Sequence, residues 1–204
     1  MGTVPMVESG EAKHMRFVIL MGSPRKNGNT AALLTPFTET LLKAGHEVRR
    51  FDLYDLEIRG CEACRACQRD WSAPNCRIRD GMTEILDEVL KADRIVLATP
   101  IYSWYCTAPM KAALDRMVYA LNKYYGDEKG PSIWAGKRLS AITTCGYRPE
   151  KGTDLFEEGM KRYAKHSGLV WQGLLCERHL GYKTVFMDEE KREHAEAFAQ
   201  EIMK

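Results

Sequence analysis

The fold is decided by the stretch Phe17-Val18-Ile19-Leu20-Met21-Gly22-Ser23-Pro24-Arg25-Lys26-Asn27-Gly28-Asn29-Thr30. It runs from an apolar, strand-like segment through a loop of small residues into the start of a helix. At such a junction, free backbone N–H groups and the positive end of the helix dipole converge and favour an anion. The loop adds two flexible glycines, hydroxyl and amide donors, and two cations. We therefore predict a phosphate-binding loop here.

The glycine spacing excludes two common phosphate-binding loops. A P-loop requires G-x-x-x-x-G-K-[ST], but Gly22 and Gly28 are too far apart, and Asn29-Thr30 stands where Lys-Ser/Thr is needed. The dinucleotide fingerprint requires a second glycine where Pro24 stands. What remains suits one terminal phosphate held without a metal, and the alternative is an ordinary strand-to-helix turn.

Composition indicates one soluble domain. The chain has 204 residues and a formal net charge of +2, which predicts neither a nucleic-acid surface nor an acidic tail. No apolar run reaches membrane-spanning length, and residues 1–14 lack the apolar region of a signal peptide. We interpret residues 1–14 as a disordered leader or expression remnant, with the domain at 15–204. Seven cysteines without a secretion signal favour free thiols and a cytoplasmic location.

Strand and helix patterns alternate along the chain. Strands are expected at 16–21, 47–52, 94–99, 138–143 and 169–175, and helices at 30–44, 82–91, 109–121, 154–167 and 189–203. Five such repeats predict an α/β fold with a doubly wound, five-stranded parallel sheet. Gly45 and Asp188 fit the end of the first helix and the start of the last, whereas Pro36 fits poorly inside the first.

Strand polarity predicts the sheet order 2-1-3-4-5. The segments at 17–21 and 95–98 are continuously apolar, as central parallel strands are, and the segment at 47–51 is polar enough for an edge. This order places a switch point between the first and third strands, where ligands bind beyond the carboxyl ends of the strands.

Two further loops are expected at that switch point. The first, at 99–105, contains Tyr102, Trp104 and Tyr105, and aromatic faces beside backbone donors suit a flat heteroaromatic ligand. The second, at 143–147, is small and polar, so its backbone could reach the edge of a ring. The alternative is that Trp104 or Tyr105 simply packs into a core or an interface. FMN combines one terminal phosphate with a large flat ring and fits all three loops.

The phosphate-binding loop resembles that of the NAD(P)H-dependent FMN reductase family, a flavodoxin-like group. The match is carried by Gly22-Ser23-Pro24-Arg25 and Gly28-Asn29-Thr30, by Thr99-Pro100-Ile101-Tyr102, and by Pro109-Met110-Lys111 with Asp115-Arg116. It covers about residues 15 to 200. The resemblance implies a flavodoxin-like fold, non-covalent FMN and reduction by NADH or NADPH.

The resemblance also implies which residues contact the cofactor. The phosphate would be held by Ser23, Arg25, Asn27, Gly28, Asn29 and Thr30. The isoalloxazine would be lined by Pro100, Ile101, Tyr102, Ser103, Trp104, Thr144, Cys145 and Gly146. Asp115 and Arg116 are interpreted as structural, on the helix surface or between subunits. Because the flavin does the chemistry, no side chain is assigned as catalytic.

Cys61, Cys64 and Cys67 stand at two-residue gaps, with Cys76 further on. This spacing resembles the cysteine cluster of iron–sulfur flavoproteins and is compatible with a [4Fe-4S] cluster. It departs from the bacterial ferredoxin pattern, because eight residues precede the fourth cysteine and Arg77, not proline, follows it. The interpretation we favour is free thiols in a loop beside the flavin. A [4Fe-4S] cluster, zinc and a redox disulfide are the alternatives.

The sequence thus predicts an FMN-dependent oxidoreductase that takes hydride from NAD(P)H and passes electrons to a flavin, a quinone or another small acceptor. The alternatives are an iron–sulfur flavoprotein electron carrier and a non-enzymatic flavin-binding protein. No nucleic-acid or membrane partner is expected. A homodimer or homotetramer is expected from large apolar residues that the sequence leaves without an evident place in the core, namely Trp104, Tyr105, Met117, Tyr119, Tyr124, Tyr125 and Trp134.

Overall fold

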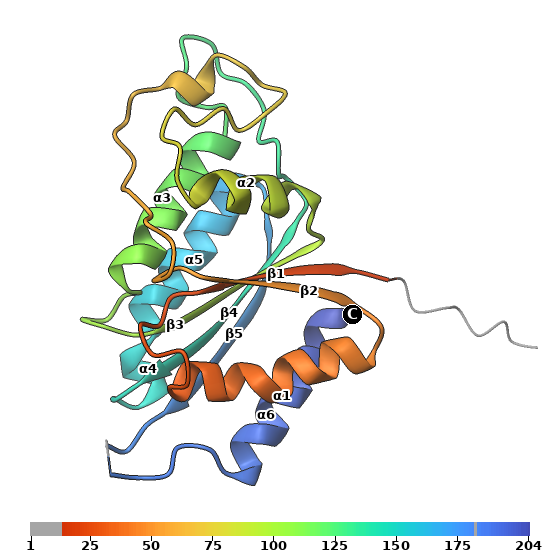
Figure 1. Cartoon of the computed structure of the whole chain (residues 1–204), viewed down its shortest axis with the longest axis vertical. Helices are drawn as coiled ribbons and strands as arrows, with labels where there is room; N and C mark the ends of the chain where they lie inside the picture. The colour runs from red at the N-terminus through yellow and green to blue at the C-terminus, as the bar shows by residue number, and fades with distance from the viewer. Residues whose placement is uncertain (1–13, 182) are drawn as a thin grey trace, which may run out of the picture.

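The computed structural model describes residues 14–181 and 183–204 as one parallel sheet between two layers of helices (Figure 1). Its strands are β1 (Arg16–Met21), β2 (Glu47–Asp52), β3 (Arg94–Pro100), β4 (Arg138–Cys145) and β5 (Val170–Arg178). Its helices are α1 (Asn29–Lys43), the 3-10 turn η1 (Ala66–Gln68), α2 (Met82–Lys91), α3 (Ala108–Leu121), α4 (Pro149–Gly152), α5 (Asp154–Ser167) and α6 (Glu189–Met203).

The strand order is β2-β1-β3-β4-β5, with every pair parallel. The central strands β1 and β3 are almost wholly buried, whereas the polar β2 lies at one edge. This confirms the doubly wound, flavodoxin-like arrangement and the order predicted from strand polarity. The switch point therefore lies where β1 and β3 end side by side.

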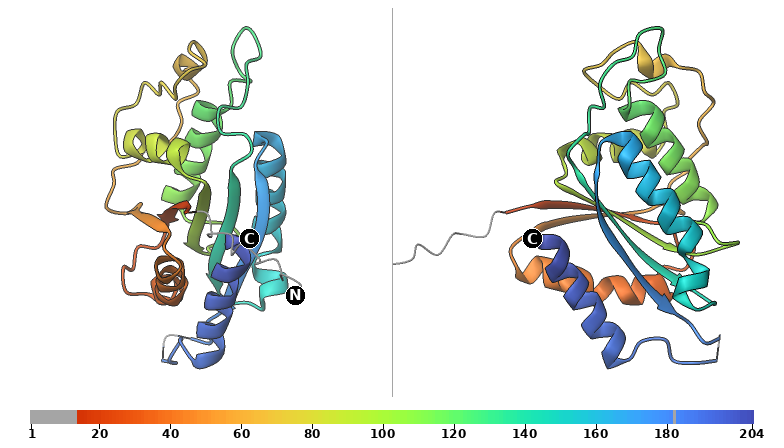
Figure 2. Two further views of the ribbon diagram at one scale, coloured as in Figure 1. Left: turned by 90° about the vertical axis from the view of Figure 1, so that its right-hand side faces the viewer. Right: turned by 180° about the vertical axis from the view of Figure 1, so that it is seen from behind.

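Alternate residues of β1 contribute their side chains to two separate hydrophobic cores, one on each face of the sheet. Phe17, Ile19 and Met21 pack under α1 and α6 on one face, and Val18 and Leu20 pack under α2, α3 and α5 on the other. Figure 2 shows the two helical layers on opposite sides of the twisted sheet. The period-2 alternation of a strand gives each face its own apolar set, and this fixes the register of the sheet.

Element boundaries differ from expectation mainly at carboxyl ends. The strands β3, β4 and β5 run one to three residues further than predicted, and the short helices η1 and α4 were not predicted. Asp188 caps α6 through the backbone N–H of Lys191 at 2.9 Å, as expected. Pro36 lies buried within α1, where its carbonyl accepts a hydrogen bond from the Thr40 hydroxyl at 2.9 Å.

Two long connections, residues 53–81 and 122–137, project beyond the end of α3 and lie side by side (Figures 1 and 2). The fully buried ammonium of Lys123 joins them, donating to the carbonyl oxygens of Cys67 at 2.8 Å and of Ala73 and Ala120 at 2.7 Å each. These three bonds use all three donors of the group. Burial lowers the pKa of Lys123.

Within the described residues, no helix combines the length and apolar character needed to cross a bilayer. The leader predicted at residues 1–14 falls outside the described residues except for His14, which is exposed.

Candidate functional site

A cleft opens at the carboxyl ends of the strands, where three loops meet. Its inner part encloses about 170 Å³. It is lined by Ser23, Arg25, Gly28, Asn29, Thr30, Pro100, Ile101, Tyr102, Thr144, His179, Gly181 and Thr184. The loops after β1, β3 and β4 therefore converge as the topology predicted.

The amino terminus of α1 opens into this cleft. Gly28 occupies the N-cap position, so the first turn has no side-chain cap, and that turn also carries no acidic residue. The uncapped N–H groups and the helix dipole are thus available to an anion. A Cβ on Gly28 would lie 2.8 Å from the Cβ of Arg25, so only glycine fits this tight loop. The Ser23 hydroxyl supports the loop by accepting from the Arg25 N–H at 3.1 Å.

The loop after β3 is a two-residue turn that presents an indole to solvent. Tyr102 and Tyr105 exchange backbone hydrogen bonds of 2.8 and 3.0 Å across it. The two residues between them, Ser103 and Trp104, have φ values of 49° and 63°, a left-handed conformation that costs free energy outside glycine. Trp104 stacks on Tyr147, with ring centroids 5.6 Å apart and planes 17° from parallel. The strained turn fixes a flat aromatic wall at the mouth of the cleft.

An outer cavity of about 250 Å³ adjoins the inner one and shares Ile101 with it. It is lined by Ile101, Ser103, Trp104, Cys145, Gly146, Tyr147 and Gly152. Direct contacts tie the loops together, because the hydroxyls of Thr30 and Thr144 lie 2.9 Å apart and the Ile101 N–H donates to the Thr144 carbonyl at 2.8 Å. The cleft is therefore polar at its inner end and aromatic at its outer end.

The structure brings together every residue predicted to contact the cofactor except Asn27. Asn27 is exposed and lines neither cavity. The prediction missed His179, Gly181 and Thr184, which follow β5, and it missed Tyr147. These four residues follow the fourth and fifth predicted strands. Their position could have indicated a place in the cleft, since the loops after parallel strands share one edge of the sheet.

The four clustered cysteines converge elsewhere. Cys61, Cys64, Cys67 and Cys76 line one small pocket against Tyr119 and Ala120, at the far end of α3. Helix geometry places this end roughly 14–20 Å along α3 from the loop after β3. The expectation of free thiols in a loop beside the flavin stays a prediction, and within this chain the cysteine pocket lies at the other end of α3 from the loop after β3.

None of the described residues forms a group of three or more His, Cys, Asp or Glu side chains arranged to hold a metal. The pocket nevertheless supplies the four thiols that the spacing singled out. The Cys67 thiol donates to the Tyr119 carbonyl at 3.1 Å, and burial raises its pKa. Cys67 is therefore protonated near neutral pH in the state described.

Arg116 is fully buried beneath this pocket, so its expected place on the helix surface or between subunits is wrong, although its role is structural as predicted. Its guanidinium donates to both carboxylate oxygens of Asp80, at 2.7 and 2.5 Å, and to Cys76 Sγ at 3.3 Å. It also donates to the Ile78 carbonyl at 2.9 Å. Arg116 therefore anchors the cysteine-bearing connection to α3, while Asp115 forms an exposed ion pair with Lys111.

The aromatic set expected at a subunit interface is only partly exposed. Trp134 and Met117 are in the core, and the Trp134 indole donates to Asn122 Oδ1 at 2.7 Å. Tyr105, Tyr119, Tyr124 and Tyr125 are half-buried, and only Trp104, at 47 %, is an exposed large side chain. The connection at 122–137 packs against α5, where the Trp134 ring meets Tyr163 and the Asn122 amide donates to the Ser167 hydroxyl, and the Trp134 indole is buried as a result.

Comparisons with known proteins place this geometry in a family. The family model for NADPH-dependent FMN reductases matches residues 15–154. The chain belongs to this family. The NAD(P)H:quinone oxidoreductase of Methanothermobacter marburgensis has the same fold, with a TM-score of 0.63, 22 % identity, and 94 % of this chain and 98 % of that chain covered.

Curated relatives of this FMN reductase family member include iron–sulfur flavoproteins and a quinone oxidoreductase. An iron–sulfur flavoprotein of Archaeoglobus fulgidus is 35 % identical over 104 residues, which is 51 % of this chain and 46 % of that protein. An FMN-dependent NADH:quinone oxidoreductase of Pseudomonas fluorescens is 28 % identical over 142 residues, 64 % of this chain and 70 % of that protein. The chain spans about half the length of the first of these relatives.

Proposed function

We propose that this protein binds FMN at the carboxyl edge of the sheet and acts as an NAD(P)H-dependent oxidoreductase. The observation that carries the proposal is the uncapped amino terminus of α1, which opens into a cleft continuing to the aromatic wall of Trp104 and Tyr147. A phosphate fits the helix terminus and a flat ring fits the outer cavity.

Each part of the cleft has a distinct task in this proposal. The backbone N–H groups at the start of α1, with Ser23, Asn29 and Thr30, hold the phosphate, and Arg25 supplies positive charge. Pro100 to Trp104 and Thr144 to Gly146 orient the ring and leave one face open to reactants. Bound FMN supplies two-electron hydride chemistry. No side chain of the cleft is assigned a proton transfer.

The substrates follow from the family and the open cleft. NADH or NADPH delivers the hydride, and a flavin, quinone, nitro or azo compound receives the electrons at the same exposed face. One curated relative and one solved structure of the same fold are named as quinone oxidoreductases, which supports a small-molecule acceptor.

Matched asparagine variants test the phosphate site. Asn29→Asp should weaken FMN binding by about 1–3 kcal/mol, because a donor is lost and a negative charge faces the phosphate. Asn27→Asp adds the same charge two residues away, where the side chain lines neither cavity, and should change the affinity far less. Calorimetric titration with FMN measures both. Equal affinity losses in the two variants would contradict the placement of the phosphate at α1.

Stopped-flow mixing tests the reaction. Excess NADH or NADPH should reduce the FMN-loaded protein, and the absorbance band of oxidised flavin should disappear within the time of one catalytic turnover. If neither nucleotide bleaches the band over minutes, the reductase proposal fails and a non-enzymatic flavin-binding role gains support.

A second candidate function is electron transfer through a [4Fe-4S] cluster at Cys61, Cys64, Cys67 and Cys76. It is favoured by the convergence of all four cysteines on one pocket and by a relative named as an iron–sulfur flavoprotein. Such clusters are held by thiolates, and an N–H donor such as Arg116 beside Cys76 would tune their potential. Iron and sulfide analysis of protein purified without oxygen tests whether the cluster is present. The Cys64→Ser variant, which lacks one of the four candidate ligands, should contain less of both elements. Absence of both elements refutes the cluster.

We also propose a cytoplasmic homodimer or homotetramer. The mouth of the cleft carries three exposed aromatic residues, Tyr102, Trp104 and Tyr147, which a second subunit would cover. All seven cysteines are free thiols, as in a reducing compartment. Light scattering at micromolar concentration should give a multiple of the chain mass, and a single-chain mass would refute the assembly.

A further inference from the structure

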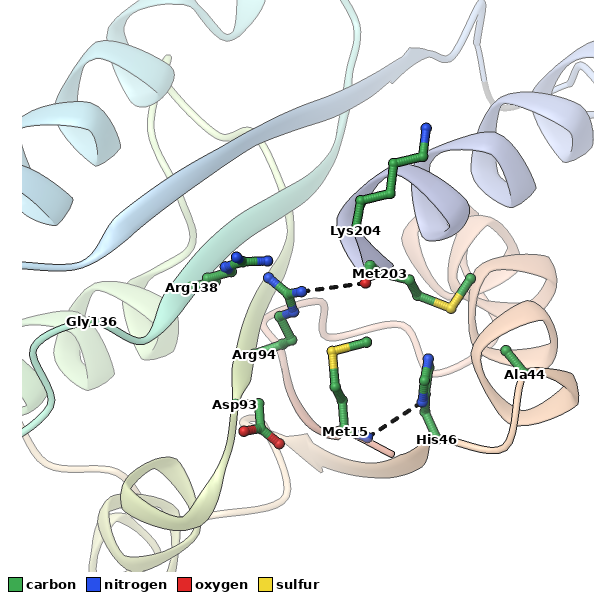
Figure 3. Close-up of a pocket in the computed structure, with 9 residues that line it drawn as sticks. All are labelled: Met15, Ala44, His46, Asp93, Arg94, Gly136, Arg138, Met203 and Lys204. Carbon is green, nitrogen blue, oxygen red and sulfur yellow. Dashed lines mark hydrogen bonds between the residues drawn. The ribbon is translucent and has the colours of Figure 1, made fainter. Parts of the chain in front are cut away.

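A further cavity, of about 530 Å³, lies at the opposite edge of the sheet from the flavin cleft (Figure 3). The amino ends of β3 and β4 meet the end of α6 there. It is lined by Met15, Ala44, His46, Asp93, Arg94, Gly136, Arg138, Met203 and Lys204. Its volume is within the range of pockets that hold small organic molecules.

Two arginines stand side by side in this cavity. Arg94 and Arg138 are register partners on neighbouring parallel strands, and their guanidinium groups approach each other in Figure 3. Neighbouring strands are about 4.8 Å apart, and like charges at directly opposed positions destabilise a sheet. The pair therefore needs a compensating negative charge.

Among the described residues, Asp93 acts on Arg94 through its charge but forms no ion pair with either arginine. Arg94 is only 4 % exposed, yet its Nε and Nη1 have no hydrogen-bond partner, and its Nη2 reaches only the Met203 carbonyl at 3.5 Å. Within residues 14–181 and 183–204, neither Arg94 nor Arg138 forms an ion pair. Burial, and then the charge of Arg138, lowers the pKa of Arg94 to about 10.

The one acidic lining residue points elsewhere. Asp93 accepts the backbone N–H of Arg16 at 2.8 Å, and Figure 3 shows its carboxylate directed away from both guanidinium groups. A buried charged group without partners is costly, so its retention calls for an explanation such as a bound anion. Met15 and Met203 add flexible apolar surface beside the arginines.

We propose that this cavity binds a small organic anion, whose carboxylate or phosphate lies between Arg94 and Arg138 and whose apolar part lies against Met15 and Met203. A carboxylate or a phosphate can accept charge-assisted hydrogen bonds from guanidinium groups, and its negative charge would offset the repulsion between Arg94 and Arg138. The site is independent of the flavin cleft, so its test does not depend on the proposed function.

Calorimetric titration of the purified protein with three small probes tests the site. Benzoate and phenyl phosphate distinguish a carboxylate ligand from a phosphate ligand, and benzyl alcohol is the neutral comparison. At least one of the two anions should bind once per chain, and benzyl alcohol should not bind. Inorganic phosphate should bind at least tenfold more weakly than the better organic anion. Failure of both anions at millimolar concentration overturns the proposal, and equal binding of inorganic phosphate overturns its apolar part.

Arginine variants then locate the bound anion. Arg94→Gln and Arg138→Gln should each weaken the better anion at least tenfold. Arg162→Gln removes a charge from the exposed face of α5 and should leave the affinity unchanged. Unchanged affinity in both pocket variants would assign the anion to another site, including the flavin cleft, and overturn the proposal.

Two further measurements cover folding and competition. If Arg94→Gln does not fold, Arg138→Gln alone decides the location, since Arg138 is only partly buried. Without ligand, Arg94→Met should raise Tm because it removes an unpaired buried charge, and a lowered Tm would indicate that Arg94 is already paired. If the probes bind only after a neutral Gly-Ser-Gly extension beyond Lys204, the chain's own terminal carboxylate fills the site and the proposal is wrong.

Discussion

Breaking the buried ion pair between Arg116 and Asp80 should destabilise the protein strongly. Both side chains are almost completely buried, at 0 % and 7 % exposed, and Arg116 → Gln would leave the Asp80 carboxylate short of its two guanidinium bonds. Removing one partner of such a pair costs about 3–5 kcal/mol. For a domain of this size, that loss lowers Tm by roughly 6–20 °C.

Lys111→Gln is the matched control, because it breaks an ion pair of similar length on the same helix. The Lys111–Asp115 pair is 2.7 Å long, but its side chains are about half exposed, at 48 % and 46 %. Exposed pairs contribute about 0–1 kcal/mol. Urea unfolding monitored by tryptophan fluorescence compares the two variants. A loss below about 1 kcal/mol for Arg116→Gln, equal to the control, would refute the assigned anchoring role.

The same pair sets a pH dependence. Burial alone raises the pKa of Asp80, but hydrogen bonds from Arg116 and from the backbone N–H groups of Arg59 and Met82 outweigh it, so the net pKa is lowered. A carboxyl with a lowered folded-state pKa contributes stability above its unfolded value of about 4 and loses it as the pH falls through the folded value. The unfolding free energy of the wild type should therefore fall below about pH 4, and Arg116→Gln should flatten this fall.

Three further outcomes follow from burial and close packing. Trp134→Ala should cost about 3–5 kcal/mol in urea unfolding without changing the mass measured by light scattering, because the indole lies in the core. Gly22→Ala should weaken FMN binding in calorimetric titration, since a Cβ would lie 3.0 Å from Thr107 Oγ1 and shift the loop. Cys106, whose pKa burial raises to about 12, should resist iodoacetamide at pH 8 in metal-free protein, while the exposed Cys64 reacts, as peptide mass analysis would record.

The features that sequence predicts well here are those with a local cause. The bounds of β1 and β2 follow from short apolar or alternating runs that end at a glycine or a turn. The loop between Gly22 and Thr30 could be singled out because its donors are contiguous in the chain, and its phosphate-binding role stays a prediction. The strand order followed from polarity alone, because an edge strand such as β2 tolerates charge and a central one does not.

The misplaced residues depend on distant parts of the chain. Trp134 is covered by Tyr163 of α5, with ring centroids 6.0 Å apart, a contact across nearly thirty residues that no local pattern encodes. His179 reaches the cleft only because β5 ends beside β4. Arg116 was the avoidable error, since it lies three residues after Ala113 and four before Ala120, on the apolar face of α3.

The buried ammonium of Lys123 gives the projecting connections a stability of their own. Lys123 and Arg116 tie residues 53–81 to the rest of the molecule, together with the bonds of Cys67 and Gln68 to the Tyr119 carbonyl. We expect this region to open as one cooperative unit, while the sheet stays closed, when these contacts break together. Amide hydrogen exchange would then divide the molecule in two, with fast, collective exchange in the projecting unit and global protection in β1 and β3. Deprotonation of Lys123 would take the charge out of its three hydrogen bonds and should therefore shift this opening equilibrium.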